Sequence, residues 1–254
     1  MTTLSSAFDA TQIDATAARL ASAHPSDIIA EALTHFDGLT ISFSGAEDVV
    51  LIDLAAREAE KLGKQFRVFT LDTGRLHPET LEFIQRVSNH YDVPIEAYHP
   101  QAKAVEDLVR EKGLFSFRTD GHQECCGIRK VEPLGRALDG VEAYATGQRK
   151  DQSPGTRADI PVVQLDPGFG RADDPLVKFN PLANWSSAQV WQQIMAYGVP
   201  YNPLHDQGFK SIGCAPCTRA THPGEHERAG RWWWEEATQK ECGLHSINLE
   251  RSER

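Results

Sequence analysis

Short β-prone segments alternate with segments of helical periodicity along the first 150 residues. A β-prone run at Leu39–Phe43 leads into a polar turn and then into apolar residues at helical spacing over residues 49–55. The same unit recurs at Phe66–Leu71, after which Pro78 opens a second helical segment, since proline is favoured at the first position of a helix. The pattern predicts repeated strand–loop–helix units.

Two further strands are expected at Ile95–Tyr98 and at residues 143–147, with a helical segment between them. Strands that alternate with helices predict an α/β protein whose parallel sheet is covered on both faces. Beyond residue 160 the chain becomes rich in Pro and Gly, with one helix expected over residues 186–197 and a tail rich in Arg, Trp and His. We interpret this part as an extension of one domain spanning residues 1–254.

Composition and charge limit the classes of function. The chain has 254 residues, 40% hydrophobic and 24% charged, and no run of roughly 18 apolar residues that could span a membrane. The first 14 residues lack the basic-then-apolar pattern of a secretory signal, so a cytoplasmic location is expected. A net charge of −10 argues against a nucleic-acid partner. An anionic substrate therefore requires a local basic pocket.

Polar loops follow the predicted strands, and the carboxyl ends of parallel strands gather at one edge of a sheet, where ligands bind. The turn at residues 44–48 lies between a strand and a helix, so its N–H groups and hydroxyl could hold a phosphate at the helix N-terminus. Similar turns join strands to helices in many proteins without binding anything. The candidate nucleotide-binding residues in these loops are Ser44, Gly45, Asp48, Asp72, Thr73 and Gly74.

Five cysteines in a reducing compartment indicate metal binding or catalysis rather than disulfides. Cys125-Cys126 and the CxxC segment with Cys214 and Cys217 supply four thiolates, which suit either zinc or an iron-sulfur cluster. Neighbouring side chains diverge, which makes an adjacent pair awkward for one tetrahedral zinc ion and favours the four separate corners of a [4Fe-4S] cluster. Zinc remains an alternative at this stage.

Cys242 stands apart, among polar residues near the end of the sequence. Lys240 and His245 favour its thiolate form, and Gly243 lets another molecule approach, so this cysteine is a candidate nucleophile. The alternative is an incidental surface cysteine.

Basic residues are concentrated in the second half of an acidic chain. Several lie beside the cysteines and polar loops, where phosphate and sulfate need cationic partners; they include Arg149, Lys150, Arg157, Arg219, Arg228 and Arg231. Lys130 follows Cys126 by four residues on an expected helix, so it could bridge cluster and substrate electrostatically. The run Trp232–Trp234 is expected to pack the tail. The loop histidines His122, His222 and His226 could in principle bind a metal, but lone histidines in loops are expected to be solvated.

Three motifs together resemble the cluster-bearing sulfonucleotide reductases, a family acting on adenosine 5′-phosphosulfate or its 3′-phosphorylated form. They are CCGIRKVEPL at 125–134, GCAPCT at 213–218 and ECGLH at 241–245, and the resemblance covers about residues 39–245. It implies an adenine nucleotide α-hydrolase-like (Rossmann-like) parallel sheet with a C-terminal extension that carries the catalytic cysteine on a mobile tail, residues 232–254. It also implies a [4Fe-4S] cluster on Cys125, Cys126, Cys214 and Cys217, and a phosphate-binding role for residues 44–48.

The same resemblance implies a mechanism. The Cys242 thiolate would attack the sulfur of adenosine 5′-phosphosulfate, expel AMP and become S-sulfonated; thioredoxin would then release sulfite for cysteine biosynthesis. An electrostatic role for the cluster, felt through Lys130, is expected rather than electron transfer. By the resemblance, the residues that hold the sulfate end are Lys130, Arg228, Arg231 and His245, with Arg157 toward the nucleotide.

Three alternatives remain open from the sequence. The same chemistry could act on 3′-phosphoadenosine 5′-phosphosulfate, although enzymes for that substrate usually lack the four cluster cysteines. An ATP-cleaving adenylating or tRNA-thiolating enzyme shares the fold, but its loop reads Ser-Gly-Gly-x-Asp-Ser, where this chain has Ala46 and Val49. A metal-stabilised binding module predicts that Cys242 can be lost without consequence. The sequence leaves open whether the chain forms a homo-oligomer.

Overall fold

The computed structural model describes residues 8–9, 11–153, 157–170 and 175–235. Its α-helices are α1 Ile13–Leu20, α2 Pro25–His35, α3 Ala46–Leu62, α4 Pro78–Tyr91, α5 Ala102–Lys112, α6 Gln123–Cys126, α7 Glu132–Ala137 and α8 Ser187–Tyr197. Its strands are β1 Leu39–Phe43, β2 Phe66–Leu71, β3 Ile95–Tyr98, β4 Ala143–Ala145, β5 Val163–Leu165 and β6 Val177–Phe179. Short 3₁₀ turns occur at η2 Ser116–Arg118, η4 Lys150–Gln152, η5 Pro203–Gln207 and η6 Ala215–Cys217, and a π-helical turn at η3 Gly127–Val131.

The six strands form one sheet in the order β3-β2-β1-β4-β6-β5. β1 pairs with β4, and β4 with β6, in parallel, whereas β5 is antiparallel to β6. The α/β class and the parallel sheet expected from the sequence are therefore confirmed, with an antiparallel edge that the pattern did not predict. Helices α1 and α2 also lie in a region for which the pattern made no prediction.

The chain divides into two compact units that are interleaved in sequence. Unit 1 comprises Met1–Phe69, Ile84–Glu96 and Gly140–Tyr201, and unit 2 comprises Thr70–Phe83, Ala97–Asp139 and Asn202–Arg254. Unit 1 contains β1, β4, β5 and β6, and unit 2 contains the four paired cysteines. The single domain over residues 1–254 stays a prediction.

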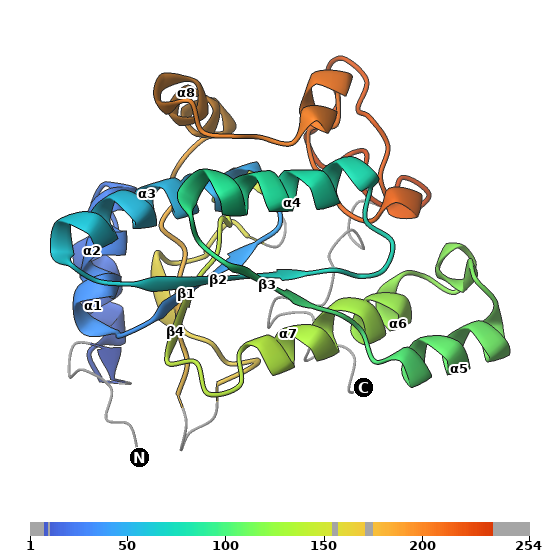
Figure 1. Cartoon of the computed structure of the whole chain (residues 1–254), viewed down its shortest axis with the longest axis horizontal. Coiled ribbons are helices and arrows are strands. Elements are labelled where there is room, and N and C mark those ends of the chain that lie inside the picture. Colours follow the sequence, from blue (N-terminus) through green and yellow to red (C-terminus); the bar gives the residue numbers. More distant parts are fainter. Residues whose placement is uncertain (1–7, 10, 154–156, 171–174, 236–254) are drawn as a thin grey trace. The chain divides into compact units, whose positions relative to one another are not determined.

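The core of unit 1 is formed largely by β1 and α3, whose side chains are buried on several faces. Leu39, Ile41 and Phe43 of β1 are almost fully buried, and so are all residues from Val49 to Ala55 of α3, as expected for a helix covered on several faces. Helix α2 packs on α3, and α3 packs on β1 (Figure 1). The residues directly after β1 are therefore held on a rigid base.

In unit 2 the cysteine pair sits on a helical stretch of mixed geometry. Helix α6 ends at Cys126 and continues through the π-helical turn η3 into α7 (Figure 1). The sequence predicts an ordinary helix here, with Lys130 placed by the four-residue spacing from Cys126. In the π turn hydrogen bonds close over five residues rather than four, and the Glu132 N–H accordingly donates to the Gly127 carbonyl. Such turns are frequent at functional sites.

The described chain ends at Glu235 with the tryptophan run. Trp232 is buried and Trp233 is exposed, so the expected packing role is met by Trp232. Residues 236–254 of the tail predicted to be mobile, including Cys242 and His245, lie outside the described residues. Among the helices that the structure describes, none combines the length and the apolar character needed to cross a membrane.

Candidate active site

The loops after β1 and β4 meet in unit 1 because these strands are parallel neighbours. The Asp48 carboxylate ties them together: Oδ2 accepts hydrogen bonds from the Ser44 N–H (2.8 Å), the Ser44 hydroxyl (2.8 Å) and the Gly45 N–H (2.9 Å). Oδ1 accepts one from the Gly147 N–H (2.8 Å). The three predicted nucleotide-binding residues Ser44, Gly45 and Asp48 thus form one network. The N–H and hydroxyl donors of this network are bonded to the Asp48 carboxylate. The N–H groups in the first turn of α3 have no carbonyl partner within the helix, as at the start of any α-helix.

Gly147 and Arg149 belong to this network although the sequence analysis gave Gly147 no role. A Cβ on Gly147 would lie 2.5 Å from the Glu47 Cβ and 2.6 Å from Asp48 Oδ1, so only glycine allows this approach. The fully buried guanidinium of Arg149 donates to Glu47 Oε1 through Nε (3.2 Å) and Nη2 (3.0 Å). The loop after β4 is therefore locked onto the start of α3.

Replacing Asp48 with asparagine is expected to lower the free energy of unfolding at pH 7 by about 1–3 kcal/mol, because the amide NH₂ would face an N–H donor. Burial, followed by repulsion from Glu47, raises the pKa of Asp48 to about 6, against the effect of the donors. The folded chain then binds this proton more readily than the unfolded chain, so native stability rises as pH falls from 7 toward 4.

Urea unfolding of the native chain and the Asp48→Asn variant at pH 7 and pH 5 measures both effects. The difference in stability between the two proteins should widen at pH 5, since the amide does not titrate. If the variant were as stable as the native chain at pH 7, the Asp48 hydrogen bonds to the loops after β1 and β4 would not stabilise the fold.

Arg157, predicted to bind the nucleotide, lies in unit 1 within a buried polar region. Its Nη1 donates to Gln152 Oε1 (2.5 Å). Nearby, the Tyr144 hydroxyl donates to Asp166 Oδ2 (2.6 Å), and Lys178 Nζ lies 3.7 Å from the same oxygen. Burial lowers the pKa of Lys178, opposed by Asp166 and reinforced by the Arg157 charge. The role of Arg157 toward a nucleotide stays a prediction.

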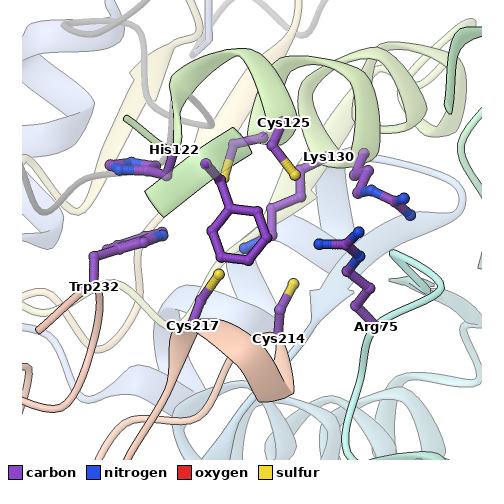
Figure 2. Close-up of a pocket in the computed structure, with 10 residues that line it drawn as sticks. Arg75, His122, Cys125, Lys130, Cys214, Cys217 and Trp232 are labelled. Carbon is purple, nitrogen blue, oxygen red and sulfur yellow. The ribbon is translucent and has the colours of Figure 1, made fainter. Parts of the chain in front are cut away.

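All four cysteines predicted as ligands line one pocket in unit 2. Cys125 and Cys126 come from α6, and Cys214 and Cys217 from the segment around η6, so two stretches far apart in sequence converge (Figure 2). The pocket is lined by Arg75, Phe117, His122, Cys125, Cys126, Arg129, Lys130, Cys214, Cys217 and Trp232.

The loop after β2 supports this pocket directly. The Thr73 hydroxyl lies 3.2 Å from Cys214 Sγ, and the Thr73 carbonyl accepts a hydrogen bond from Arg129 Nη1 (2.6 Å). Gly74 has φ +70°, a left-handed conformation that favours glycine, and its N–H donates to Asp72 Oδ1 (2.8 Å). Thr73 thus contacts a cysteine of the pocket, and Asp72 and Gly74 are its neighbours in the same loop. The predicted role of all three residues toward a nucleotide stays a prediction.

Cations and unused hydrogen-bond donors surround the cysteines. Burial raises the pKa of Cys217 to about 12, against the nearby charges of Lys130 and Arg231. Burial also raises the pKa of Cys125, opposed by Arg129, Arg75 and Lys130. Three buried nitrogen atoms at the pocket have no hydrogen-bond partner in the structure: Arg75 Nη1, Arg129 Nε and Trp232 Nε1. Buried donors are normally satisfied, so these suit a bound group that carries acceptors.

The residues present can be tested against the two candidate groups. In the part of the chain that the structure describes, no three His, Cys, Asp or Glu side chains are arranged to hold a single metal ion. Four thiols around one pocket, with cationic and neutral donors beside them, fit a [4Fe-4S] cluster, which takes one thiolate at each corner and accepts hydrogen bonds at its sulfurs.

His122 is buried, so the expectation that this loop histidine is solvated is wrong. Its side chain is 1% exposed and lines the pocket, its ring stacks on Trp232 with centroids 4.1 Å apart, and Nδ1 donates to Glu235 Oε2 (2.6 Å). Figure 2 shows the two rings lying face to face at one side of the cysteines. No local pattern marks this residue, because its carboxylate partner is 113 positions away.

Of the other predicted residues, Arg231 and Lys130 lie near the Trp232 ring of this pocket, whereas Cys242 and His245 lie outside the described residues. Arg231 is buried, with its guanidinium 4.5 Å from the Trp232 ring centroid, and it lies so close to Gly213 that a Cβ there would collide with it. Lys130 Nζ lies 5.7 Å from the same ring centroid. Arg228 is half-buried.

The parallel sheet and the polar loops at its carboxyl edge define an α/β protein of the adenine nucleotide α-hydrolase-like class. Residues 38–220 match the model of the phosphoadenosine phosphosulfate reductase domain, and the chain belongs to that family. It is therefore an oxidoreductase that acts on a sulfur group.

Similar proteins carry closely related names. The adenosine 5′-phosphosulfate reductase of Pseudomonas aeruginosa (strain LESB58) is 57% identical over 238 residues, covering 93% of this chain and 88% of that protein. The probable 5′-adenylylsulfate reductase 1, chloroplastic, of Oryza sativa subsp. japonica is 55% identical over 246 residues, covering 95% of this chain and 51% of that protein.

Among solved structures, the phosphoadenylyl-sulfate reductase of Candida auris in a phosphate complex has a TM-score of 0.68 at 27% identity, covering 84% of this chain and 98% of that one. An FMN adenylyltransferase of Candida glabrata, with a TM-score of 0.57 at 17% identity over 97% of this chain and 85% of that one, shares the fold alone.

Proposed function

We propose that the chain is a thioredoxin-dependent adenylyl-sulfate reductase, which converts adenosine 5′-phosphosulfate to sulfite and AMP in sulfate assimilation toward cysteine. The observation that carries this proposal is the convergence of Cys125, Cys126, Cys214 and Cys217 on one pocket with cationic side chains. The names of the bacterial and plant relatives described above support the same substrate.

In the first step the Cys242 thiolate attacks the sulfur of the phosphosulfate. A sulfur–sulfur bond forms, the bond from that sulfur to the bridging oxygen breaks, and AMP leaves with the electron pair. Lys130, Arg228 and Arg231 are assigned to the sulfonate, whose negative charge they compensate. His245 is assigned to the same end of the substrate.

In the second step a thiolate of thioredoxin attacks the Cys242 sulfur and expels sulfite. The second thiol of thioredoxin then resolves the mixed disulfide, so thioredoxin leaves oxidised and Cys242 returns as a thiolate. The two electrons of the reduction come from thioredoxin. A cytoplasmic location is consistent with this reductant.

The four cysteines would hold a [4Fe-4S] cluster, which supplies a charged group next to Lys130. Lys130 lines the same pocket as all four cysteines, so its ammonium group links their charge to the sulfonate that it is assigned to bind. We assign it this electrostatic role because the electron balance above is complete without a redox change at the cluster. A change in the cluster's electron paramagnetic resonance signal during turnover would contradict the assignment.

Intact-mass measurement tests the function. The anaerobically purified chain, incubated with adenosine 5′-phosphosulfate and no thioredoxin, should gain one SO₃ group, roughly 80 mass units by atomic composition, as a covalent intermediate. Peptide mapping should place the group on Cys242, and reduced thioredoxin should remove it as sulfite.

The same incubation with 3′-phosphoadenosine 5′-phosphosulfate decides between the two substrates. The proposal expects faster adduct formation with the unphosphorylated nucleotide. A faster reaction with the 3′-phosphorylated one would reverse the substrate assignment. No adduct with either, but AMP formation from ATP, would assign the chain to the ATP-cleaving class.

A further inference from the structure

Two arginines of the cysteine pocket lie in unit 2 without an acidic partner. Arg129 is only 7% exposed, and its Nη1 donates to the Thr73 carbonyl (2.6 Å). Arg75 donates through Nη2 to the Leu114 carbonyl (2.7 Å). Within the part of the chain that the structure describes, neither guanidinium forms an ion pair with a carboxylate. Because a buried charge without a counter-charge is costly, an anion is expected beside them.

Each guanidinium also has a buried nitrogen that no acceptor meets. Arg129 Nε and Arg75 Nη1 have no hydrogen-bond partner among the described residues, although buried donors are normally satisfied. The bonds to backbone carbonyls hold both guanidinium groups in place. The missing partner is therefore an acceptor inside the pocket that both side chains line.

The charges of both arginines act on the same side of the pocket. Burial raises the pKa of Cys125, and the charges of Arg129 and Arg75 oppose this effect. The Arg75 carbonyl also accepts a hydrogen bond from the Ala215 N–H (2.8 Å), within the second cysteine segment. Figure 2 shows the Arg75 side chain on the side of the pocket where Cys125 and Cys214 lie. Two cations thus face the thiols of this side.

Thr73 connects Arg129 to the same side. Its carbonyl accepts the hydrogen bond from Arg129, and its hydroxyl lies 3.2 Å from Cys214 Sγ. At Cys217 the nearby positive charges are instead those of Lys130 and Arg231, which are assigned above to the sulfonate. The cations of the pocket therefore fall into two sets, of which only one has been given a role.

We propose that Arg129 and Arg75 are the charge partners of the iron-sulfur cluster, to whose sulfur atoms they donate hydrogen bonds through Arg129 Nε and Arg75 Nη1. The inference rests on the proposed function, because it assumes a cluster on the four cysteines. A cluster held by four thiolates is anionic, and hydrogen bonds and positive charge at its sulfurs stabilise it and raise its reduction potential. Both guanidinium groups are held by backbone carbonyls, so they serve the cluster and not the substrate.

Removal of iron from the anaerobically purified, iron-loaded chain tests the proposal. In the Arg129→Gln variant, loss of iron to an excess of chelator should be at least about tenfold faster than in the native chain, as expected for one lost hydrogen bond between charged groups. Arg75→Gln should change the rate in the same direction. The affinity for AMP should stay at the native value in both variants, since neither arginine binds the substrate.

Reduction of the cluster by an external reductant gives a readout that a merely structural role would not move. A cation beside the cluster favours the added electron, so Arg129→Gln should lower the equilibrium constant for one-electron reduction about tenfold, or by about 59 mV in midpoint potential. Arg129→Lys, which keeps the positive charge, should stay within about threefold of the native constant. A redox titration followed by electron paramagnetic resonance measures both.

Arg136→Gln is the matched control. Arg136 is an arginine of α7, also in unit 2, and it too donates to a backbone carbonyl, that of His99. It pairs with the Glu132 carboxylate (2.7 Å) and does not line the pocket. The rate of iron loss and the reduction constant of this variant should therefore equal those of the native chain.

The outcomes separate the inference from the function. A native chain that holds the cluster but gains no SO₃ group would overturn the proposed function alone. A native chain that gains the group, with both glutamine variants losing iron within twofold of its rate, would overturn the inference alone. Faster loss of iron with an unchanged reduction constant would indicate a structural role and would overturn the inference as well. Should Arg129→Gln not fold, Arg75→Gln decides in the same way.

Discussion

Replacing Cys242 with serine is expected to abolish sulfite formation, with a loss of at least about four orders of magnitude in turnover, as for other enzymes deprived of their nucleophile. A serine hydroxyl is far less acidic than a thiol and supplies no nucleophilic anion near neutral pH. A sulfonated serine would also lack the sulfur–sulfur bond that thioredoxin attacks when it releases sulfite by thiol–disulfide exchange. Sulfite release and the intact mass after incubation with substrate measure the two steps separately.

The Cys242→Ser chain should keep its iron content, its visible absorbance and its affinity for AMP, because the four thiols assigned to the cluster are those of Cys125, Cys126, Cys214 and Cys217. Those properties serve as the control for folding. A serine variant that still forms sulfite would reject the nucleophile assignment, and the interpretation of the chain as a metal-stabilised binding module would gain support.

Replacing Cys217 with serine should remove the iron-sulfur cluster and with it all measurable activity. Cys217 is buried, and burial holds the pKa of its free thiol at about 12. The metal must offset that cost when it binds the thiolate, and serine is a much weaker ligand for iron. Because a group that binds only the folded chain stabilises it, the thermal midpoint should also fall, by roughly 5 °C or more.

Iron and sulfide analysis, visible absorbance and calorimetry on anaerobically purified protein measure these losses. The Cys242→Ser chain is the matched control, since it carries the same substitution at a cysteine that is not assigned to the cluster. Retention of a full iron complement by Cys217→Ser would contradict the assignment of the four ligands. Stoichiometric zinc in the native chain, with no iron or sulfide, would contradict the cluster itself.

The fold was predictable where apolar runs are long enough to show a period. Leu39–Phe43, Phe66–Leu71 and Ile95–Tyr98 were expected at the bounds that the structure has, because each is an apolar-rich run followed by turn residues. Val163–Leu165 and Val177–Phe179 were not predicted. Three residues are too few to show a period of two, and these strands are defined by pairing with each other and with β4.

Those parts of the site that depend on residue type and spacing could be predicted from the sequence. Paired thiols are rare enough that the four cysteines could be assigned from spacing. Thr73 was expected at the nucleotide because a polar turn after a strand is typical of such sites, and that role stays a prediction. The contact of its hydroxyl with Cys214 Sγ joins residues far apart in sequence, so no local pattern could predict it. The pairing of His122 with Glu235 depends on tertiary structure, which no local pattern contains.

During synthesis the cysteine pocket can form only after both of its cysteine segments have been made. The two units are completed at different times. Unit 1 uses no residue beyond Tyr201, whereas unit 2 begins at Thr70 and needs the chain from Asn202 onward. Domains tend to fold as units while the chain emerges from the ribosome, so unit 1 can fold while Cys214 and Cys217 are still missing. We therefore expect the proposed cluster to be inserted late, into a chain whose first unit is already folded.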